Sequence, residues 1–198
     1  MFSETTVRIM GFHGIKAYFD KNISTTPMVS LGAVRLKTKL GVVITASHNP
    51  PSYNGYKLKS DLGGPSIPRD IDAVEALIPN TDIVDVLPTL EQMEQDGLLE
   101  YINLEDMYYD EVASKFDLNL IRNSGVVCAY DAMYGSGQNI VRRILPNAVP
   151  LHCEINPGFN GQAPEPIHKN LTELSNLIKS NEKITCGLAN DGDADRIG

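Results

Sequence analysis

The chain has 198 residues, of which 42% are hydrophobic and 21% are charged, an ordinary composition for a globular protein of one or two domains. Its net charge of −8 argues against nucleic acid or an anionic membrane as a partner, because phosphate groups on such surfaces are bound through clustered Lys and Arg. No stretch approaches the roughly 20 apolar residues of a membrane-spanning helix, and no signal peptide is evident, so we expect a cytoplasmic protein.

The first part of the chain predicts helices and strands in alternation. Residues 3–10, followed by Gly11, resemble the last turns of a helix with a glycine cap, and residues 15–19 predict a strand. Thr25-Thr26-Pro27 provides a hydroxyl cap and a first-turn proline for a second helix, which we expect to stop before Gly41. Apolar residues at helical spacing predict another helix over residues 67–78.

Residues 41–57 place a serine where a short apolar strand ends in a polar turn. Residues 42–44 are a continuous apolar run, typical of a parallel strand buried on both faces. Asn49-Pro50-Pro51 and Asn54-Gly55 then interrupt the strand and predict a loop. Ser47 and His48 should therefore lie at the carboxyl end of a strand, where open α/β sheets bind ligands.

The second part of the chain repeats the α/β alternation. Asn103 is expected to cap a helix, and residues 126–130 predict a buried strand followed by a turn at Gly135-Ser136-Gly137 and a helix. Further strands are expected within residues 147–155 and 184–189, with a helix over residues 171–178. The pattern predicts two α/β domains, residues 1–103 and 104–198.

The three cysteines, Cys128, Cys153 and Cys186, are odd in number and have no C-x-x-C spacing. Two of them lie in apolar runs that resemble strands. We therefore expect all three to be reduced residues of the core, with no role in binding a metal.

Three alternating aspartates, Asp191, Asp193 and Asp195, follow the last predicted strand. Such closely spaced like charges are unfavourable unless a cation neutralises them, and carboxylate oxygens suit Mg²⁺ or Ca²⁺. An EF-hand is disfavoured because Arg196 stands where that loop requires glycine. Arg196 itself fits two roles, a ligand of a phosphoryl group or a salt-bridge partner of a neighbouring aspartate.

The serine turn and the aspartate loop together predict phosphoryl transfer through Ser47, with a cation sharing oxygens of its phosphate. Lys57 is a candidate general base, because a lysine near a metal and other cations can have a lowered pKa. His48 is expected either to carry protons or to orient phosphate. Backbone N–H groups of Gly135-Ser136-Gly137 could bind an anion, although a structural role is favoured for this common turn.

Five motifs make the chain resemble the α-D-phosphohexomutases, the family of phosphoglucomutases and phosphomannomutases. In chain order they are Thr45-Ala46-Ser47-His48-Asn49-Pro50, Tyr53-Asn54-Gly55-Tyr56-Lys57, Asp131-Ala132-Met133-Tyr134-Gly135-Ser136-Gly137, Pro164-Glu165-Pro166 and Asp191-Gly192-Asp193-Ala194-Asp195-Arg196. The resemblance implies two three-layer α/β domains with mixed sheets, the first two of four. It also implies interconversion of hexose 1-phosphate and hexose 6-phosphate, of glucose or mannose, through a hexose 1,6-bisphosphate.

The same resemblance implies a role for each candidate residue. Ser47 would carry the phosphoryl group, Arg196 would contact it, and Lys57 and His48 would assist proton movement. The residues expected to act in catalysis are Ser47, His48, Lys57 and Arg196. The groups expected to bind Mg²⁺ are the Ser47 phosphate, Asp191, Asp193 and Asp195.

The chain also departs from the family pattern. It lacks the first strand of domain one and everything beyond the metal loop, including the loops that select the sugar and hold the distal phosphate. It therefore looks like a fragment, which we expect to be inactive or weakly active alone. Two alternatives remain open: a haloacid-dehalogenase-like phosphatase whose nucleophile is an aspartate, and a non-catalytic fragment that keeps the Mg²⁺ loop and a phosphate pocket.

Overall fold

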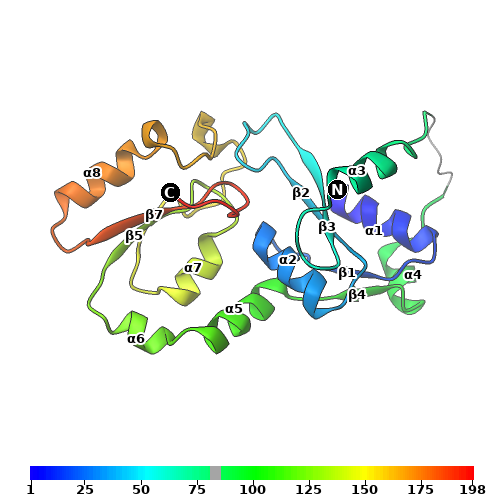
Figure 1. Ribbon diagram of the computed structural model, residues 1–198, viewed down its shortest axis with the longest axis horizontal. Helices are drawn as coiled ribbons and strands as arrows, with labels where there is room; N and C mark the ends of the chain where they lie inside the picture. The colour runs from blue at the N-terminus through cyan, green and yellow to red at the C-terminus, as the bar shows by residue number, and fades with distance from the viewer. Residues whose placement is uncertain (81–85) are drawn as a thin grey trace.

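The computed structural model describes residues 1–80 and 86–198, which form two α/β halves joined at helix α5 (Figure 1). The first half contains α1 (Phe2–Phe12), β1 (Ala17–Phe19), α2 (Thr26–Arg35), β2 (Leu40–Thr45), β3 (Gly55–Ser60), α3 (Pro68–Glu75), α4 (Leu90–Gln95) and β4 (Leu99–Tyr101). The second half contains α5 (Leu104–Lys115), α6 (Leu118–Arg122), β5 (Cys128–Asp131), α7 (Gln138–Ile144), β6 (Val149–Leu151), α8 (Thr172–Ser180) and β7 (Cys186–Ala189). Within the described residues, no helix has the length and apolar character needed to cross a bilayer.

The second half has three layers around a parallel sheet of order β6-β5-β7. On one face, Ala129 and Ala189 pack against Leu174 of α8. On the other face, Tyr130 packs near Val141 of α7. Because β5 and β7 are parallel neighbours, their carboxyl ends lie at the same edge of the sheet, where the turn after Asp131 and the aspartate loop meet.

The first half has two separate two-stranded sheets, a parallel pair β1-β4 and an antiparallel pair β2-β3. The expected parallel strand over residues 42–44 is therefore wrong in its pairing. Residues 46–54 are a short connection of the kind that joins antiparallel strands, and the chain returns directly as β3. The strand is also less buried than expected, because Val43 is the buried residue of β2 and its neighbours are partly exposed. Lys57 consequently lies on a strand beside the serine turn.

Two helices of the first half do not end where the positions of glycine predicted. Gly11 lies inside α1, where a Cβ atom would come within 2.5 Å of the Met93 side chain, so this glycine serves close packing and does not end the helix. The turn after the helix is made by Gly14, with φ +70°. Helix α2 ends at Arg35, and Gly41 lies inside β2.

Several helix starts agree with the sequence. The Thr25 hydroxyl accepts a hydrogen bond from the backbone N–H of Met28 at the start of α2. The Asn103 side chain accepts one from the N–H of Asp106 at the start of α5. Leu104 then packs against Met28, so α5 attaches to α2 of the first half. These caps fix where α2 and α5 begin.

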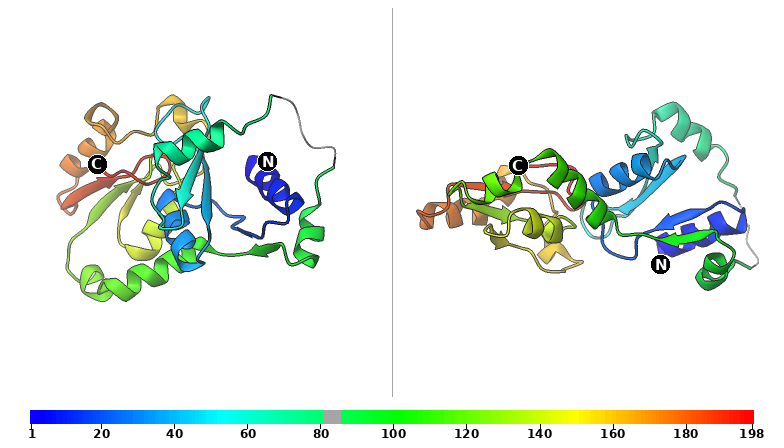
Figure 2. Two further views of the ribbon diagram at one scale, coloured as in Figure 1. Left: turned by 45° about the vertical axis from the view of Figure 1, so that its right-hand side comes forward. Right: turned by 90° about the horizontal axis from the view of Figure 1, so that it is seen from below.

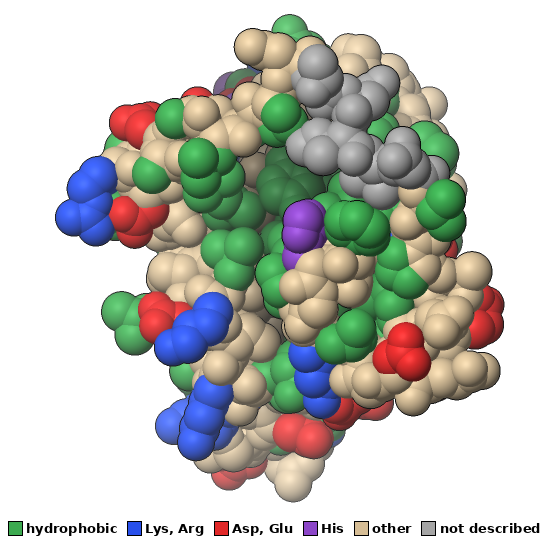
Figure 3. All heavy atoms as spheres, turned by 90° about the vertical axis from the view of Figure 1, so that its right-hand side faces the viewer, with side chains coloured by type: hydrophobic (Ala, Val, Ile, Leu, Met, Phe, Trp, Pro, Cys, Tyr) green, Lys and Arg blue, Asp and Glu red, His purple; other side chains and the backbone are tan. Residues whose placement is uncertain are grey.

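The first half leaves several large hydrophobic side chains exposed, among them Phe2, Phe12 and Leu77, the last with 81% of its surface accessible. Figure 3 faces this half and shows hydrophobic side chains gathered around a hollow. Figure 2 shows the two short sheets lying apart. One buried apolar cluster of this half consists of Val7, Met93 and Leu99.

Met93 is fully buried and contacts the cluster of Val7 and Leu99, so its truncation should leave a cavity. We expect Met93→Ala to lower the free energy of unfolding by about 2–5 kcal/mol. Leu120→Ala is the matched control, because Leu120 is 69% exposed and its truncation should cost less than about 0.5 kcal/mol. Urea denaturation followed by circular dichroism measures both, and equal losses in the two variants would contradict this description of the core.

Candidate functional site

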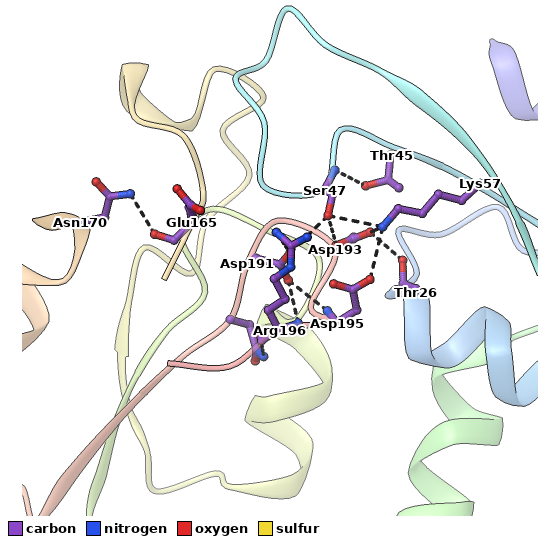
Figure 4. Close-up of polar contacts among 11 residues, drawn as sticks. Thr26, Thr45, Ser47, Lys57, Glu165, Asn170, Asp191, Asp193, Asp195 and Arg196 are labelled. Carbon is purple, nitrogen blue, oxygen red and sulfur yellow. Dashed lines mark hydrogen bonds and ion pairs between the residues drawn. The ribbon is translucent and has the colours of Figure 1, made fainter. Parts of the chain in front are cut away.

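Two loops from opposite halves form the candidate site (Figure 4). The first is the turn between β2 and β3, in which Ser47 has a left-handed φ of 55°. Non-glycine residues adopt such conformations at a cost of about 1–3 kcal/mol, and such residues are enriched at functional sites. The Thr45 hydroxyl accepts a 2.8 Å hydrogen bond from the Ser47 backbone N–H, which supports the turn.

The second loop follows β7 and wraps around the carboxylate of Asp191. Asp191 Oδ1 accepts hydrogen bonds from the backbone N–H groups of Asp195, at 3.0 Å, and Arg196, at 3.1 Å. Ala194 turns the chain with a φ of 55°. The Asp191 side chain is fully buried as a result, at the bottom of the loop.

The serine hydroxyl lies against this loop. Ser47 Oγ is 3.2 Å from Asp193 Oδ1 and 3.4 Å from Asp191 Oδ2. One carboxylate oxygen from each of Asp191, Asp193 and Asp195 lies within 4.8 Å of the other two. Three carboxylates at this spacing form a hard-oxygen donor set of the kind that Mg²⁺ and Ca²⁺ prefer.

The two loops touch through backbone as well as side chains. A Cβ atom on Gly192 would come within 2.3 Å of the Ser47 carbonyl oxygen, so the approach requires glycine. On its other side, the Gly192 carbonyl accepts hydrogen bonds from the backbone N–H and the hydroxyl of Ser136. The structural interpretation of the Gly135-Ser136-Gly137 turn is therefore confirmed, since its Ser136 N–H is used to hold the aspartate loop.

Thr26 is a site residue that the sequence analysis missed. Its hydroxyl donates a 2.8 Å hydrogen bond to Asp193 Oδ2, and its backbone N–H donates one of 2.9 Å to the Asp193 carbonyl oxygen. The sequence contained a clue to this role. Thr25 alone caps α2, so the hydroxyl of the adjacent Thr26 was left without a structural task. Thr26 thereby fixes Asp193 from the opposite half of the molecule.

Lys57 supplies positive charge to the loop. Its Nζ atom is 2.8 Å from Asp193 Oδ2, 3.3 Å from Asp195 Oδ2 and 3.4 Å from Ser47 Oγ. Burial favours the neutral amine, but the hydrogen bond and charge of Asp193 outweigh it, so the pKa of Lys57 is raised. The expected lowering of this pKa presupposed a metal and other cations around Lys57, whereas the protein groups that contact its Nζ atom include two carboxylates.

Two neighbouring aspartates have opposite pKa shifts. Burial, together with the charges of Asp193 and Asp195, raises the pKa of Asp191 to about 6. Burial acts in the same direction on Asp193, but hydrogen bonds from Lys57 and Thr26 outweigh it and lower the pKa. Asp191 is therefore a buried carboxylate whose charge is poorly compensated, and a divalent cation fits the site because it would supply that compensation.

His48 and Arg196 complete the set of expected residues. His48 Nδ1 is buried and has no hydrogen-bond partner among the described residues. Arg196 Nη1 lies 3.9 Å from Asp191 Oδ2, too far for a hydrogen bond, and its side chain is 49% exposed. The weak ion pair leaves the guanidinium free to bind an anion at the mouth of the site.

The sequence matches two models of one family. Residues 1–84 match the description "Phosphoglucomutase/phosphomannomutase, alpha/beta/alpha domain I", and residues 106–198 match domain II of the same family. A phosphoglucosamine mutase of Methanococcus vannielii is 30% identical over 178 residues, a match that covers 88% of this chain and 39% of the relative. A phosphomannomutase/phosphoglucomutase of Pseudomonas aeruginosa is 29% identical, with 90% of this chain and 36% of the relative covered.

Solved structures agree with these matches. A protein of Thermus thermophilus, provisionally described as a phosphomannomutase, superposes with a TM-score of 0.79 at 32% identity, over 93% of this chain and 41% of that one. The phosphoglucomutase parafusin of Paramecium shares the fold, with a TM-score of 0.72 at 20% identity over 91% of this chain and 40% of that one. The chain thus spans about two fifths of the length of these proteins, and it belongs to the α-D-phosphohexomutase (phosphoglucomutase/phosphomannomutase) family.

Proposed function

We propose that this chain carries the phosphoryl-transfer site of an enzyme that interconverts hexose 1-phosphate and hexose 6-phosphate through a phosphoserine and a hexose 1,6-bisphosphate. The observation that supports this most is the position of the Ser47 hydroxyl, 3.2 Å and 3.4 Å from two carboxylates of the aspartate loop. A phosphoryl group on that oxygen would enter the same small volume as a cation bound by the loop. A nucleophile and a cation site in one place are the basic parts of phosphoryl transfer.

We propose that Asp191, Asp193 and Asp195, with an oxygen of the Ser47 phosphate, hold Mg²⁺. The ion, when bound, would neutralise charge on the transferring phosphoryl group. The protein contributes the placement: Thr26 and the Ser136 turn fix the loop from two sides before any ligand arrives. This preorganisation lowers the cost of bringing like charges together in the reaction.

The other polar residues take roles that follow from their contacts. The Lys57 ammonium, 3.4 Å from Ser47 Oγ, would donate a proton to that oxygen when the phosphoryl group leaves. By microscopic reversibility it would accept the proton when Ser47 attacks. His48, with its buried free Nδ1, and Arg196, with its exposed guanidinium, would hold oxygens of the phosphoryl group.

The proposed substrates are phosphates of glucose, mannose or both. Relatives of similar identity carry the names phosphoglucosamine mutase and phosphomannomutase/phosphoglucomutase, so amino sugar phosphates belong in any substrate test. We propose residues 1–103 and 104–198 as the first two domains of the enzyme. The chain spans 36–39% of the length of these relatives.

The two alternatives differ in their support. A haloacid-dehalogenase-like phosphatase is set aside, because both halves of the chain match models of the phosphohexomutases. A non-catalytic fragment would keep metal binding and lose phosphoryl transfer to Ser47. Phosphorylation of Ser47 therefore distinguishes such a fragment from the proposed enzyme.

The metal assignment predicts a loss of cation binding in Asp193→Asn. Removing one ligand charge should weaken Mg²⁺ or Mn²⁺ binding by more than about tenfold, as measured by isothermal titration calorimetry. Asp110→Asn is the control, because Asp110 is an exposed residue of α5 away from the loop. Equal affinities in the two variants, with folding confirmed by circular dichroism, would contradict the assignment.

The nucleophile assignment predicts one phosphoryl group per chain after incubation with glucose 1,6-bisphosphate and Mg²⁺. Intact mass and peptide mapping should place that group on Ser47. Ser47→Ala should remain unmodified, whereas Ser52→Ala, a change in the exposed part of the same turn, should react as the unaltered chain does. Modification of Ser47→Ala, or of an aspartate, would refute a phosphoserine mechanism, and the absence of any modification would favour the non-catalytic fragment.

Complete mutase turnover needs both phosphates of the bisphosphate to be held and water to be excluded. We therefore expect residues 1–198 alone to convert glucose 1-phosphate to glucose 6-phosphate at least about 100-fold more slowly than the Pseudomonas aeruginosa relative. A coupled glucose 6-phosphate dehydrogenase assay with saturating bisphosphate measures this. Turnover at the rate of the relative would show that this chain already contains what the reaction requires.

A further inference from the structure

Two cysteine side chains lie at the end of the second-half sheet opposite the aspartate loop. Cys128 and Cys186 begin β5 and β7 and are directly paired in the parallel register of these strands. Their Sγ atoms are 3.0 Å apart, closer than the ordinary van der Waals separation of two sulfur atoms. Both residues are free thiols of intermediate exposure, so the expectation that all three cysteines lie in the core holds for Cys153 alone.

We propose that Cys128 and Cys186 form a redox site, in which a low-molecular-weight disulfide converts the two thiols into an intrachain disulfide that joins β5 to β7. The register places both side chains on the same face of the sheet. Neighbouring registered positions in a sheet also fall within the range of Cα separations that a disulfide requires. No strand movement is needed to bring the sulfur atoms together.

The surroundings leave the pair accessible to a small oxidant. The alternate residues Ala129 and Gly187 face α8, and a Cβ atom on Gly187 would collide with Ile178. The cysteines lie on the opposite face, where Cys128 lines a cavity with Arg122. Burial and the neighbouring Cys186 thiol raise the pKa of Cys128 to about 11, so Cys128 is a thiol at neutral pH and its exchange should speed up as the pH rises.

The chemistry is two successive thiol–disulfide exchanges. One cysteine thiolate attacks a sulfur of the small disulfide, forming a mixed disulfide and releasing one small thiolate. The other cysteine attacks the mixed disulfide, forms the Cys128–Cys186 bond and releases the second. The protein loses two electrons and two protons, and the small disulfide gains them as two thiols, so excess dithiol reverses the reaction.

The position of the pair separates its effect from the phosphoryl-transfer site. The cysteines start the two strands, whereas the aspartate loop and the turn after Asp131 follow their carboxyl ends. A bond between residues 58 positions apart restricts the unfolded chain strongly. Oxidation should therefore stabilise the second half against unfolding without moving the aspartate loop. Cys153 lies apart, with its Sγ against backbone carbonyls, and should remain a thiol.

The test is oxidation of the purified chain with glutathione disulfide, followed by thiol titration in denaturant and by peptide mapping without reduction. The chain has three cysteines, and we expect one titratable thiol after oxidation and three after added dithiothreitol. The map should contain one linked peptide pair, that of Cys128 and Cys186. The thermal midpoint should rise by roughly 10 °C in the oxidised form, and Mg²⁺ affinity should stay unchanged.

Two variants control the measurement. Cys153→Ala removes the cysteine outside the pair and should oxidise and gain stability as the unaltered chain does. Cys186→Ser should show no intrachain link and no gain in the thermal midpoint under oxidising conditions. Three titratable thiols after oxidation of the unaltered chain, a linked peptide that contains Cys153, or only links between chains would each overturn the proposal.

Discussion

The contact of Lys57 with the carboxylates of Asp193 and Asp195, at 2.8 Å and 3.3 Å, is the interaction on which the site depends. Three carboxylates share a volume in which their oxygens lie within 4.8 Å of one another, and such an arrangement is unfavourable without positive charge. Lys57 comes from β3 in the first half and the aspartates from the end of β7 in the second. The same electrostatic requirement therefore joins the two halves, and it is the reason for the proposed divalent cation.

Backbone conformation places Ser47 next to the carboxylates of the aspartate loop. Ser47 and Ala194 both have left-handed φ angles, and Gly192 allows the loop to approach the Ser47 carbonyl more closely than any other residue could. These features are costly in isolation and are held by surrounding hydrogen bonds, those of Thr45 to the turn and of Ser136 to the loop. The candidate site is thus built from two loops whose backbone conformations are held by hydrogen bonds, the kind of preorganisation that the proposed reaction would need.

Short motifs were enough to single out most residues of the candidate site, because residue type and spacing are local properties of the sequence. The aspartate loop and the serine turn lie together as expected, and the helix starts at Thr25 and Asn103 follow from cap chemistry. Strand pairing was predicted wrongly at β2, since periodicity describes burial and does not specify a partner. The role of Thr26 and the raised pKa of Lys57 depend on groups more than 130 residues away in the chain, which no local pattern contains.

The most direct test of this account is the ³¹P NMR spectrum of the chain phosphorylated on Ser47, recorded while Mn²⁺ is added. If the phosphate and the cation share the site, substoichiometric Mn²⁺ should broaden the phosphoserine resonance strongly, and Asp193→Asn should largely abolish the broadening. A resonance that stays sharp while calorimetry confirms bound Mn²⁺ would place the cation away from Ser47 and contradict the account.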